Sequence, residues 1–135
     1  MAASPKNQNE IRLYLEHSKE MLAVAGQNLL NDYFSSAINR AYYAIFYAAN
    51  ALLATIGEAR GKHSGVISVF RNRFIKSGEF PAEYSDIYGR VMDNRQRGDY
   101  DPGSNVSMEQ AKTDIEDARR FVDEVERWLK EKKWV

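Results

Sequence analysis

One segment of the chain, residues 33–56, would be apolar on nearly every side if it formed a helix. Its apolar residues are Ala37, Ile38, Ala41, Tyr42, Tyr43, Ala44, Ile45, Phe46, Tyr47, Ala48, Ala49, Leu52 and Leu53. A helix of this kind must be surrounded, either by other helices of its own bundle or by a second subunit. The longest unbroken apolar run, residues 41–49, is too short to span a bilayer. We therefore expect this segment to be the central helix of a folded bundle.

Two flanking segments show the narrower apolar stripe of an amphipathic helix, with steps of three and four residues. In residues 8–30 the stripe is Ile11, Leu15, Ser18, Leu22, Ala25 and Leu29. After residue 107 it is Ala111, Ile115, Ala118, Val122, Val125 and Leu129. Shorter helices are predicted for residues 64–76 and, with Pro81 at its first position, for residues 81–97. No segment alternates like a strand, so the sequence predicts an all-α antiparallel bundle of four to five helices.

The expected boundaries follow from turn and cap residues. Asn31 and Asp32 predict a turn and a cap for the central helix, and Gly57 predicts its end. Residues 98–106 are rich in turn formers and predict an ordered loop. Residues 107–110, Ser-Met-Glu-Gln, form a capping box that opens the last helix. We expect a flexible N-terminus at residues 1–7 and a single domain at residues 8–135.

Composition excludes several classes of function. Nineteen basic residues balance nineteen acidic ones, which rules out a globally basic nucleic-acid coat. The chain has no cysteine, so disulfides, thiol nucleophiles and iron–sulfur clusters are excluded. With two histidines, His17 and His63, a transition-metal site is not expected, and neither is a cofactor. The polar N-terminus lacks the apolar core of a secretory signal. We expect a cytoplasmic protein without a membrane segment.

A local excess of positive charge lies in residues 59–78. It contains five basic residues and no acid, which is a field suited to phosphate contacts or simply a solvated helix face. Within it, His63 follows Arg60 and Lys62 at the start of a predicted helix. These two cations would lower the pKa of His63 and keep a neutral imidazole available as a base. The alternative is that His63 orients the loop or caps the helix.

A second polar cluster occupies residues 93–102. Arg95 and Arg97 could clamp a phosphate, and Tyr100 could stack on a base or donate its hydroxyl. The alternative is structural: either arginine would pair with Asp99 or Asp101 and fix the loop.

Arg40, within the central apolar segment, is costly if it is buried without a partner. We expect it to pair with Asp99 or Asp101 or to point into a cleft. The tyrosines around it are typical of a core or of a dimer interface.

Three motifs in this order and spacing resemble the HEPN domain family. They are residues 35–47 (SSAINRAYYAIFY), residues 62–67 (KHSGVI) and residues 95–102 (RQRGDYDP). The similarity covers residues 8–130 and looks closest to a small, stand-alone prokaryotic branch. The resemblance implies a helical bundle that forms a homodimer and is paired with a minimal nucleotidyltransferase in a toxin–antitoxin or defence module.

Active members of the family are metal-independent ribonucleases with an arginine followed after four to six residues by a histidine. The resemblance implies that the arginine stabilises the charge of the phosphorane and that the histidine acts as base or acid. This sequence departs from the pattern, because Tyr100 stands where the histidine is expected after Arg95, and no histidine follows. His63 could supply the imidazole if its helix approaches the loop. By analogy with family members, Tyr100 is also a candidate for modification by the partner enzyme.

Three interpretations remain open at the level of sequence. The first is a HEPN protein that binds RNA or a nucleotide through Arg60, Lys62, Arg97, Arg40, Asp99 and Asp101. In this interpretation Arg95, Tyr100 and His63 are the candidates for residual ribonuclease activity. The second is a non-catalytic dimeric assembly module whose Arg-Asp-Tyr loop is structural. The third is a helical bundle with a small ligand pocket lined by the central helix.

Overall fold

The structure is a computed structural model that describes residues 5–100 and 105–135. Those residues form five helices and one π-helical turn, without strands, which confirms the all-α prediction. In chain order the elements are α1 (Pro5–Leu30), α2 (Phe34–Ala54), α3 (His63–Phe70), the π-helical turn η1 (Arg71–Ile75), α4 (Ala82–Tyr100) and α5 (Met108–Glu131). Residues 1–4, part of the expected N-terminal tail, lie outside the described residues.

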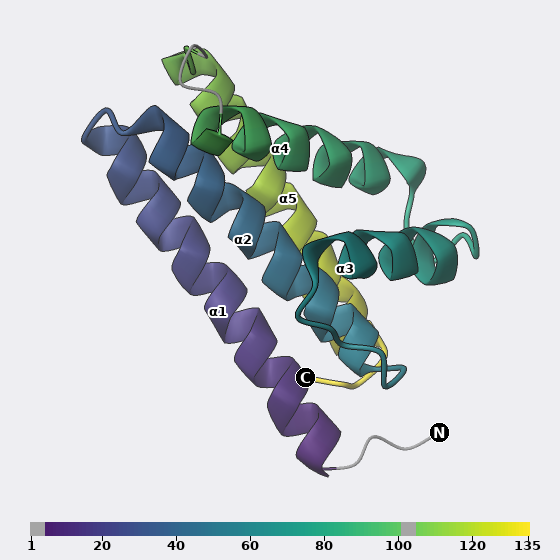
Figure 1. Cartoon of the computed structure of the whole chain (residues 1–135). Helices are drawn as coiled ribbons and strands as arrows, with labels where there is room; N and C mark the ends of the chain where they lie inside the picture. Colours follow the sequence, from purple (N-terminus) through teal and green to yellow (C-terminus); the bar gives the residue numbers. More distant parts are fainter. Residues whose placement is uncertain (1–4, 101–104) are drawn as a thin grey trace.

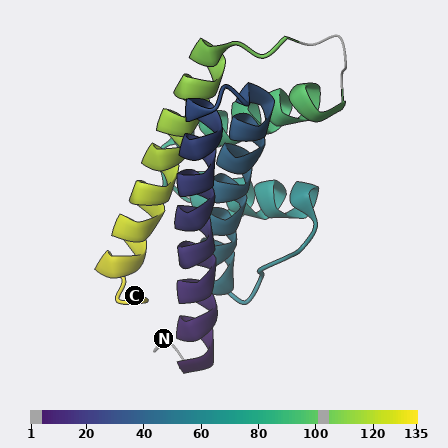
Figure 2. The same cartoon turned by 90° about the vertical axis from the view of Figure 1, so that its left-hand side faces the viewer.

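Helix α2 is the centre of the bundle. It packs against α1, α3, α4 and α5, as its apolar surface on nearly every side predicts. Figure 1 shows α1 running antiparallel to α2, with α5 behind them and with α3 and α4 lying across the axis of α2. In Figure 2 the three long helices α1, α2 and α5 lie alongside one another, and α3 and α4 project to one side. The crossing of α3 and α4 over α2 is what positions the candidate site.

The predicted apolar stripes of α1 and α5 face the core. All six stripe residues of α5 are buried, and in α1 only Leu29 is partly exposed. The first turn of α5 is capped as predicted, because the backbone N–H of Gln110 donates to Ser107 Oγ (3.0 Å). Gly57 has a φ of +71° just after the end of α2, a conformation that glycine adopts without strain.

Three predicted boundaries are wrong in detail. Asp32 forms the turn with a φ of +63°, but the N-cap position of α2 is Tyr33, without a side-chain cap. Helix α4 begins at Ala82, one residue after Pro81. It also continues to Tyr100, so residues 98–100 are helical and not part of the predicted loop. This extension places Asp99 one helical turn after Arg95, on the same face.

Candidate functional site

The first residue of α3, His63, contacts the centre of α2. The hydroxyl oxygen of Tyr42 lies 2.7 Å from His63 Nδ1, and the two ring planes are within 8° of parallel. The imidazole also stacks on Phe46, with ring centroids 4.6 Å apart. Tyr42 is fully buried and His63 is half-buried, so one edge of the imidazole rests on the core while the rest of the ring borders the surface.

The loop before α3 is held in place by a buried amide of α2. Asn50 Oδ1 accepts from the backbone N–H of Arg60 (2.9 Å), and its Nδ2 donates to the carbonyl of the same residue (3.0 Å). Such a pair satisfies two backbone groups at once and fixes the path of the loop that delivers His63. Asn50 was not among the residues predicted from the sequence, and a lone polar residue within a long apolar run is the signal that could have found it.

Arg95 enters the same cluster from α4. Its Cζ lies 4.9 Å from the centroid of the Tyr42 ring and 5.6 Å from that of Tyr43, within range of cation–π interactions. The side chain is only 12% exposed, and its Nε lies 3.3 Å from Asp99 Oδ2. The sequence spacing explains the burial, because Arg95 continues the core-facing stripe of α4 through Tyr88 and Val91.

Asn39 joins the two arginines of the cluster. Its Nδ2 donates to Asp99 Oδ2 (2.9 Å), and its Oδ1 accepts from Nη2 of Arg40 (2.6 Å). The Arg40 guanidinium lies 5.2 Å from the Tyr43 ring centroid. The predicted direct pairing of Arg40 with a carboxylate is wrong for Asp99, which Arg40 reaches only through Asn39. Because Asn39 belongs to α2 and Asp99 to α4, this network also ties the two helices together.

The electrostatics of the cluster favour neutral partners for Arg95. Burial lowers the pKa of His63, and the nearby Arg95 charge lowers it further. The predicted direction is therefore confirmed, but the cause is burial and Arg95 and not Arg60 and Lys62. Burial also raises the pKa of Tyr42 far above its ordinary value, with Arg95 opposing the rise. Tyr42 is thus a neutral hydroxyl beside a neutral imidazole at physiological pH.

The basic patch of residues 59–78 is more dispersed than the sequence suggested. Arg60 and Arg73 both lie within ion-pair distance of Glu58, at 3.6 Å and 3.3 Å, although Glu58 precedes the patch in sequence. Arg71 instead donates to Ser85 Oγ (2.8 Å). Lys62 is exposed, beside His63. Arg60, Arg71 and Arg73 therefore contact partners outside the cluster of Tyr42, His63 and Arg95.

The remaining predicted site residues do not all join the cluster. Arg97 donates to Asn94 Oδ1 (2.9 Å), and Asn94 in turn donates to the buried carboxylate of Asp114 on α5 (2.8 Å). That contact favours the structural interpretation for Arg97. Tyr100 is the last residue of α4, but its side chain lies outside the described part of the structure, as does the whole of Asp101.

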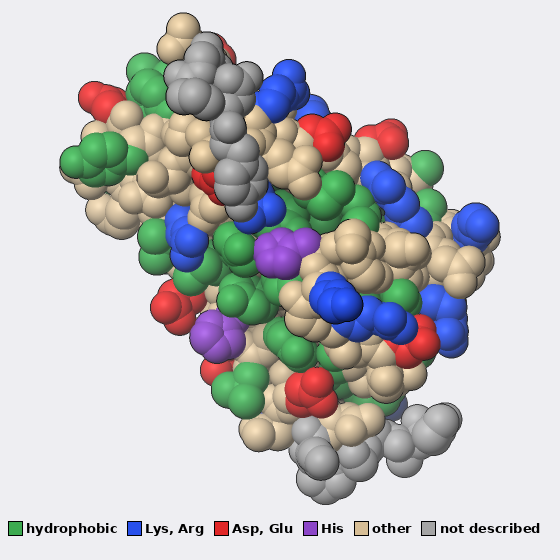
Figure 3. Space-filling view, in the orientation of Figure 1, with side chains coloured by type: hydrophobic (Ala, Val, Ile, Leu, Met, Phe, Trp, Pro, Cys, Tyr) green, Lys and Arg blue, Asp and Glu red, His purple; other side chains and the backbone are tan. Residues whose placement is uncertain are grey.

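The surface around the cluster is aromatic and basic. The face shown in Figure 3 carries both histidine side chains, with hydrophobic side chains between them and Lys or Arg side chains at the border. A chain of ring contacts connects the two histidines. The ring centroids are 5.4 Å apart for Tyr43 and His63, 6.1 Å for Tyr47 and Tyr43, and 5.3 Å for His17 and Tyr47. The tyrosines around Arg40 were predicted to be core or interface residues, and the half-buried Tyr43 is where that surface meets the site.

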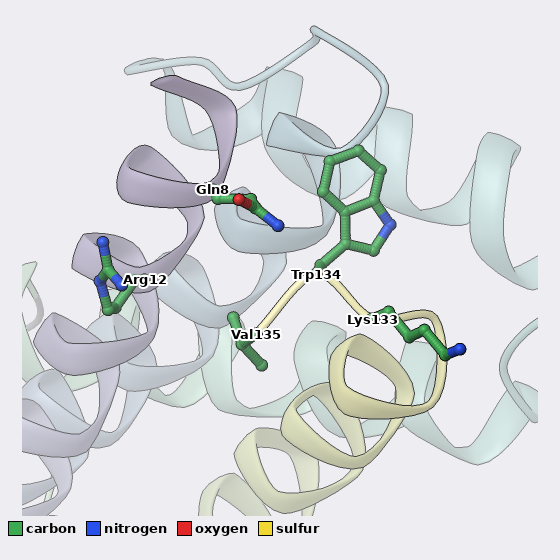
Figure 4. A pocket seen from close by; sticks show the side chains of 5 residues that line it. All are labelled: Gln8, Arg12, Lys133, Trp134 and Val135. Carbon is green, nitrogen blue, oxygen red and sulfur yellow. The ribbon is translucent and has the colours of Figure 1, made fainter. Parts of the chain in front are cut away.

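A separate hollow of about 470 Å³ lies between the N-terminal part of α1 and the last residues of the chain. Figure 4 shows its lining, which comprises Gln8, Arg12, Lys133, Trp134 and Val135. None of the predicted site residues belongs to it.

Within the described ranges no group of three or more His, Cys, Asp or Glu side chains could hold a metal ion. No helix there is long and apolar enough to cross a membrane.

Comparison with known proteins identifies the class of fold to which this helical bundle belongs. The HEPN domain model matches residues 11–128. The chain is 35% identical over 123 residues to a UPF0332 protein of Thermotoga maritima, covering 91% of this chain and 93% of that protein. It is also similar to two proteins of Methanocaldococcus jannaschii, both named "Putative toxin". One is 35% identical over 122 residues (90% of each chain), and the other 31% over 121 residues (89% and 82%). The chain belongs to the HEPN domain family.

Proposed function

We propose that this protein is a toxin-type HEPN protein that binds RNA or a nucleotide at the cluster formed by Tyr42, His63 and Arg95. The observation that carries the proposal is the meeting of Arg95 from α4 and His63 from α3 on the same tyrosine of α2. An arginine is suited to bind a phosphodiester through its planar array of donors, and an imidazole can share the same phosphate. The toxin names of two relatives support this assignment.

The position of His63 also supports a weak, metal-independent ribonuclease activity. In such a reaction the ribose 2′-hydroxyl loses its proton and its oxygen attacks the adjacent phosphorus. The bond to the 5′-oxygen breaks and that oxygen takes up a proton, so that a 2′,3′-cyclic phosphate and a 5′-hydroxyl are formed. Arg95 would stabilise the added negative charge on the phosphoryl oxygens. His63 would take the place of the family histidine, which this chain lacks after Arg95. Because it comes from a different helix, we expect a rate well below that of a ribonuclease with the family pair.

The proposed assembly is a homodimer that works with a nucleotidyltransferase. The half-buried rings of Tyr14, Tyr43 and Tyr47 contact one another and make an aromatic face that a second copy could cover. Support for the nucleotidyltransferase comes from the family resemblance alone. Light scattering over a range of concentrations tests the dimer. Co-expression with a nucleotidyltransferase encoded beside this protein tests the pair, and growth arrest relieved only by that partner is the expected result.

A second candidate function is a non-catalytic assembly module. The contacts of Asp99 with Arg95 and Asn39 favour it, because they tie α4 to α2 without any ligand. In that case Arg95 would contribute to stability and not to RNA binding. The two functions therefore predict opposite effects of the same substitution.

The deciding experiment measures RNA cleavage and binding in EDTA for the wild type, Arg95→Ala and His63→Ala. Arg120→Ala is the matched control. Arg120 lies on α5, where it pairs with Glu83 and makes no contact with Tyr42, His63 or Arg95 among the contacts described. We expect both site variants to lose binding and cleavage while remaining folded, and the control to keep both. If Arg95→Ala is destabilised but its folded fraction binds RNA as the wild type does, the result would contradict the proposal and favour the assembly module.

A further inference from the structure

The contact between Tyr42 and His63 determines which imidazole nitrogen carries the proton. The Tyr42 hydroxyl is fully buried, and His63 Nδ1 is its one hydrogen-bond partner among the described residues. If Nδ1 carried the proton and donated it, the hydroxyl hydrogen of Tyr42 would be left in the core without an acceptor. Leaving a buried donor unsatisfied costs more than a hydrogen bond contributes. The arrangement in which Tyr42 donates and Nδ1 accepts satisfies both groups.

We propose that Tyr42 is a positioning residue that fixes neutral His63 with its proton on Nε2, so that His63 acts as a hydrogen-bond donor to a phosphoryl oxygen beside Arg95. The role as donor rests on the proposed RNA binding, whereas the position of the proton does not. With Nδ1 occupied by Tyr42, the nitrogen left for a ligand is Nε2, at the other edge of the half-buried ring. In this state Nε2 has no lone pair with which to accept a proton from a ribose hydroxyl.

The surroundings of His63 keep the ring neutral and in one orientation. The rings of Tyr42, Tyr43 and Phe46 from α2 hold the imidazole at centroid distances of 5.5, 5.4 and 4.6 Å. The charged group that faces it from α4 is Arg95, and its neighbour on the preceding loop is Lys62. Burial of the ring and the charge of Arg95 both oppose formation of an imidazolium, in agreement with the lowered pKa of His63.

This arrangement changes the chemistry expected at the site. Two donors, Arg95 and His63 Nε2–H, converge on one anion, which suits binding of a phosphodiester. General-base catalysis would first require the proton to move from Nε2 to Nδ1, with Tyr42 turning its hydroxyl from donor to acceptor. Binding therefore needs no rearrangement, whereas general-base catalysis by His63 does, and this is a second reason to expect a weak ribonuclease activity.

The proton position is measured on the free protein by two-bond nitrogen–proton NMR of ¹⁵N-labelled histidine. The pH is held well above the ordinary histidine pKa of about 6.5. We expect Nε2 to be protonated and Nδ1 unprotonated in the wild type and in the control Tyr43→Phe, which retains the Tyr42 hydroxyl. Tyr42→Phe should give a mixture of both forms. A wild-type Nδ1 that carries the proton, or a Tyr42→Phe spectrum identical to that of the wild type, would overturn the inference.

The role as donor is tested by RNA binding with a labelled single-stranded oligonucleotide, 2′-deoxy-substituted to prevent cleavage. A glutamine side chain can accept from Tyr42 through its oxygen and donate through its nitrogen, as the proposed form of His63 does. We expect His63→Gln to bind within about threefold of the wild type and His63→Leu to bind about tenfold more weakly. Equal losses in the two variants would overturn the donor role. Absence of binding by the wild type would contradict the proposed function, and the NMR result would still decide the proton position.

Discussion

The guanidinium of Arg95 lies over the ring of Tyr42, with its Cζ 4.9 Å from the ring centroid, although the two residues belong to helices that are distant in sequence. Tyr42 contacts His63 through its hydroxyl at the same time. One fully buried tyrosine thus sets the positions of both charged or titratable groups of the site. The proposed RNA binding therefore predicts that a change at Arg95 or His63 affects ligand binding more than it affects the fold.

Arg95→Met keeps most of the side-chain volume and removes the charge. We expect RNA affinity to fall at least about tenfold, because the proposed phosphate donor is lost. The free energy of unfolding should fall by only about 1–2 kcal/mol, the size of a desolvated cation–π contact. Filter binding and urea unfolding measure the two effects. Arg120→Met is the control, and a loss of several kcal/mol in Arg95→Met with unchanged RNA affinity would favour a structural role.

The lowered pKa of His63 predicts a dependence of stability on pH. Because the unfolded chain binds a proton at the ordinary histidine value of 6.5 and the folded protein only at lower pH, the unfolded state binds more protons between the two values. Stability should therefore decrease as the pH falls from 6.5 through the folded pKa. His63→Gln should lack this decrease, whereas His17→Gln, the matched control, should retain it. Urea unfolding at a series of pH values tests this, and a decrease that survives in His63→Gln would contradict the assignment.

The sequence predicted the helices well, because each long helix has a strong apolar pattern of its own. Local spacing alone predicts the six-residue stripe of α5 and the apolar surface on nearly every side of α2. The stripe of α5 and most of the α2 surface are buried, as expected. The end of α4 was missed for a physical reason. Gly98 and Asp99 are typical of turns, but here Asp99 is held on the helix by Arg95 and Asn39. One contact within the helix and one tertiary contact, to Asn39 of α2, therefore outweigh the local preference for a turn.

The candidate site was predicted only in part. Arg95, His63, Arg40 and Asp99 were identified from their chemistry, and the structure brings them to one cluster. Their common contact residues, Tyr42, Tyr43 and Asn39, were not, because a tyrosine in an apolar helix has the same pattern whether it serves the core or a site. Which helix crosses α2 at Tyr42 cannot be read from periodicity, since it depends on the packing of α3 and α4.

Asp114, at 1% exposure, should make stability depend on pH in the opposite sense to His63. Burial raises the pKa of its carboxyl above the ordinary 3.8, although Asn94 and Arg90 oppose the rise. The folded state therefore holds the proton more tightly, and stability decreases as the pH rises from 3.8 through the raised value. Asp114→Asn cannot titrate, so its stability relative to the wild type should improve over that range. Urea unfolding measures the difference, and Asp86→Asn, an exposed carboxylate on α4, is the control.

Gly89 and Arg71 should be energetically coupled. A Cβ added at Gly89, within α4, would lie 2.7 Å from Nη2 of Arg71, so the guanidinium must shift, and we expect this shift to break its hydrogen bond to Ser85 Oγ. Alanine in a helix interior gains about 1 kcal/mol over glycine, and the lost hydrogen bond offsets about as much. Gly89→Ala should therefore be nearly neutral in the wild type but should stabilise Arg71→Ala by about 1 kcal/mol. A double-mutant cycle by urea unfolding measures this coupling. Equal effects of Gly89→Ala in both backgrounds would show that Arg71 does not determine the requirement for glycine at this crossing.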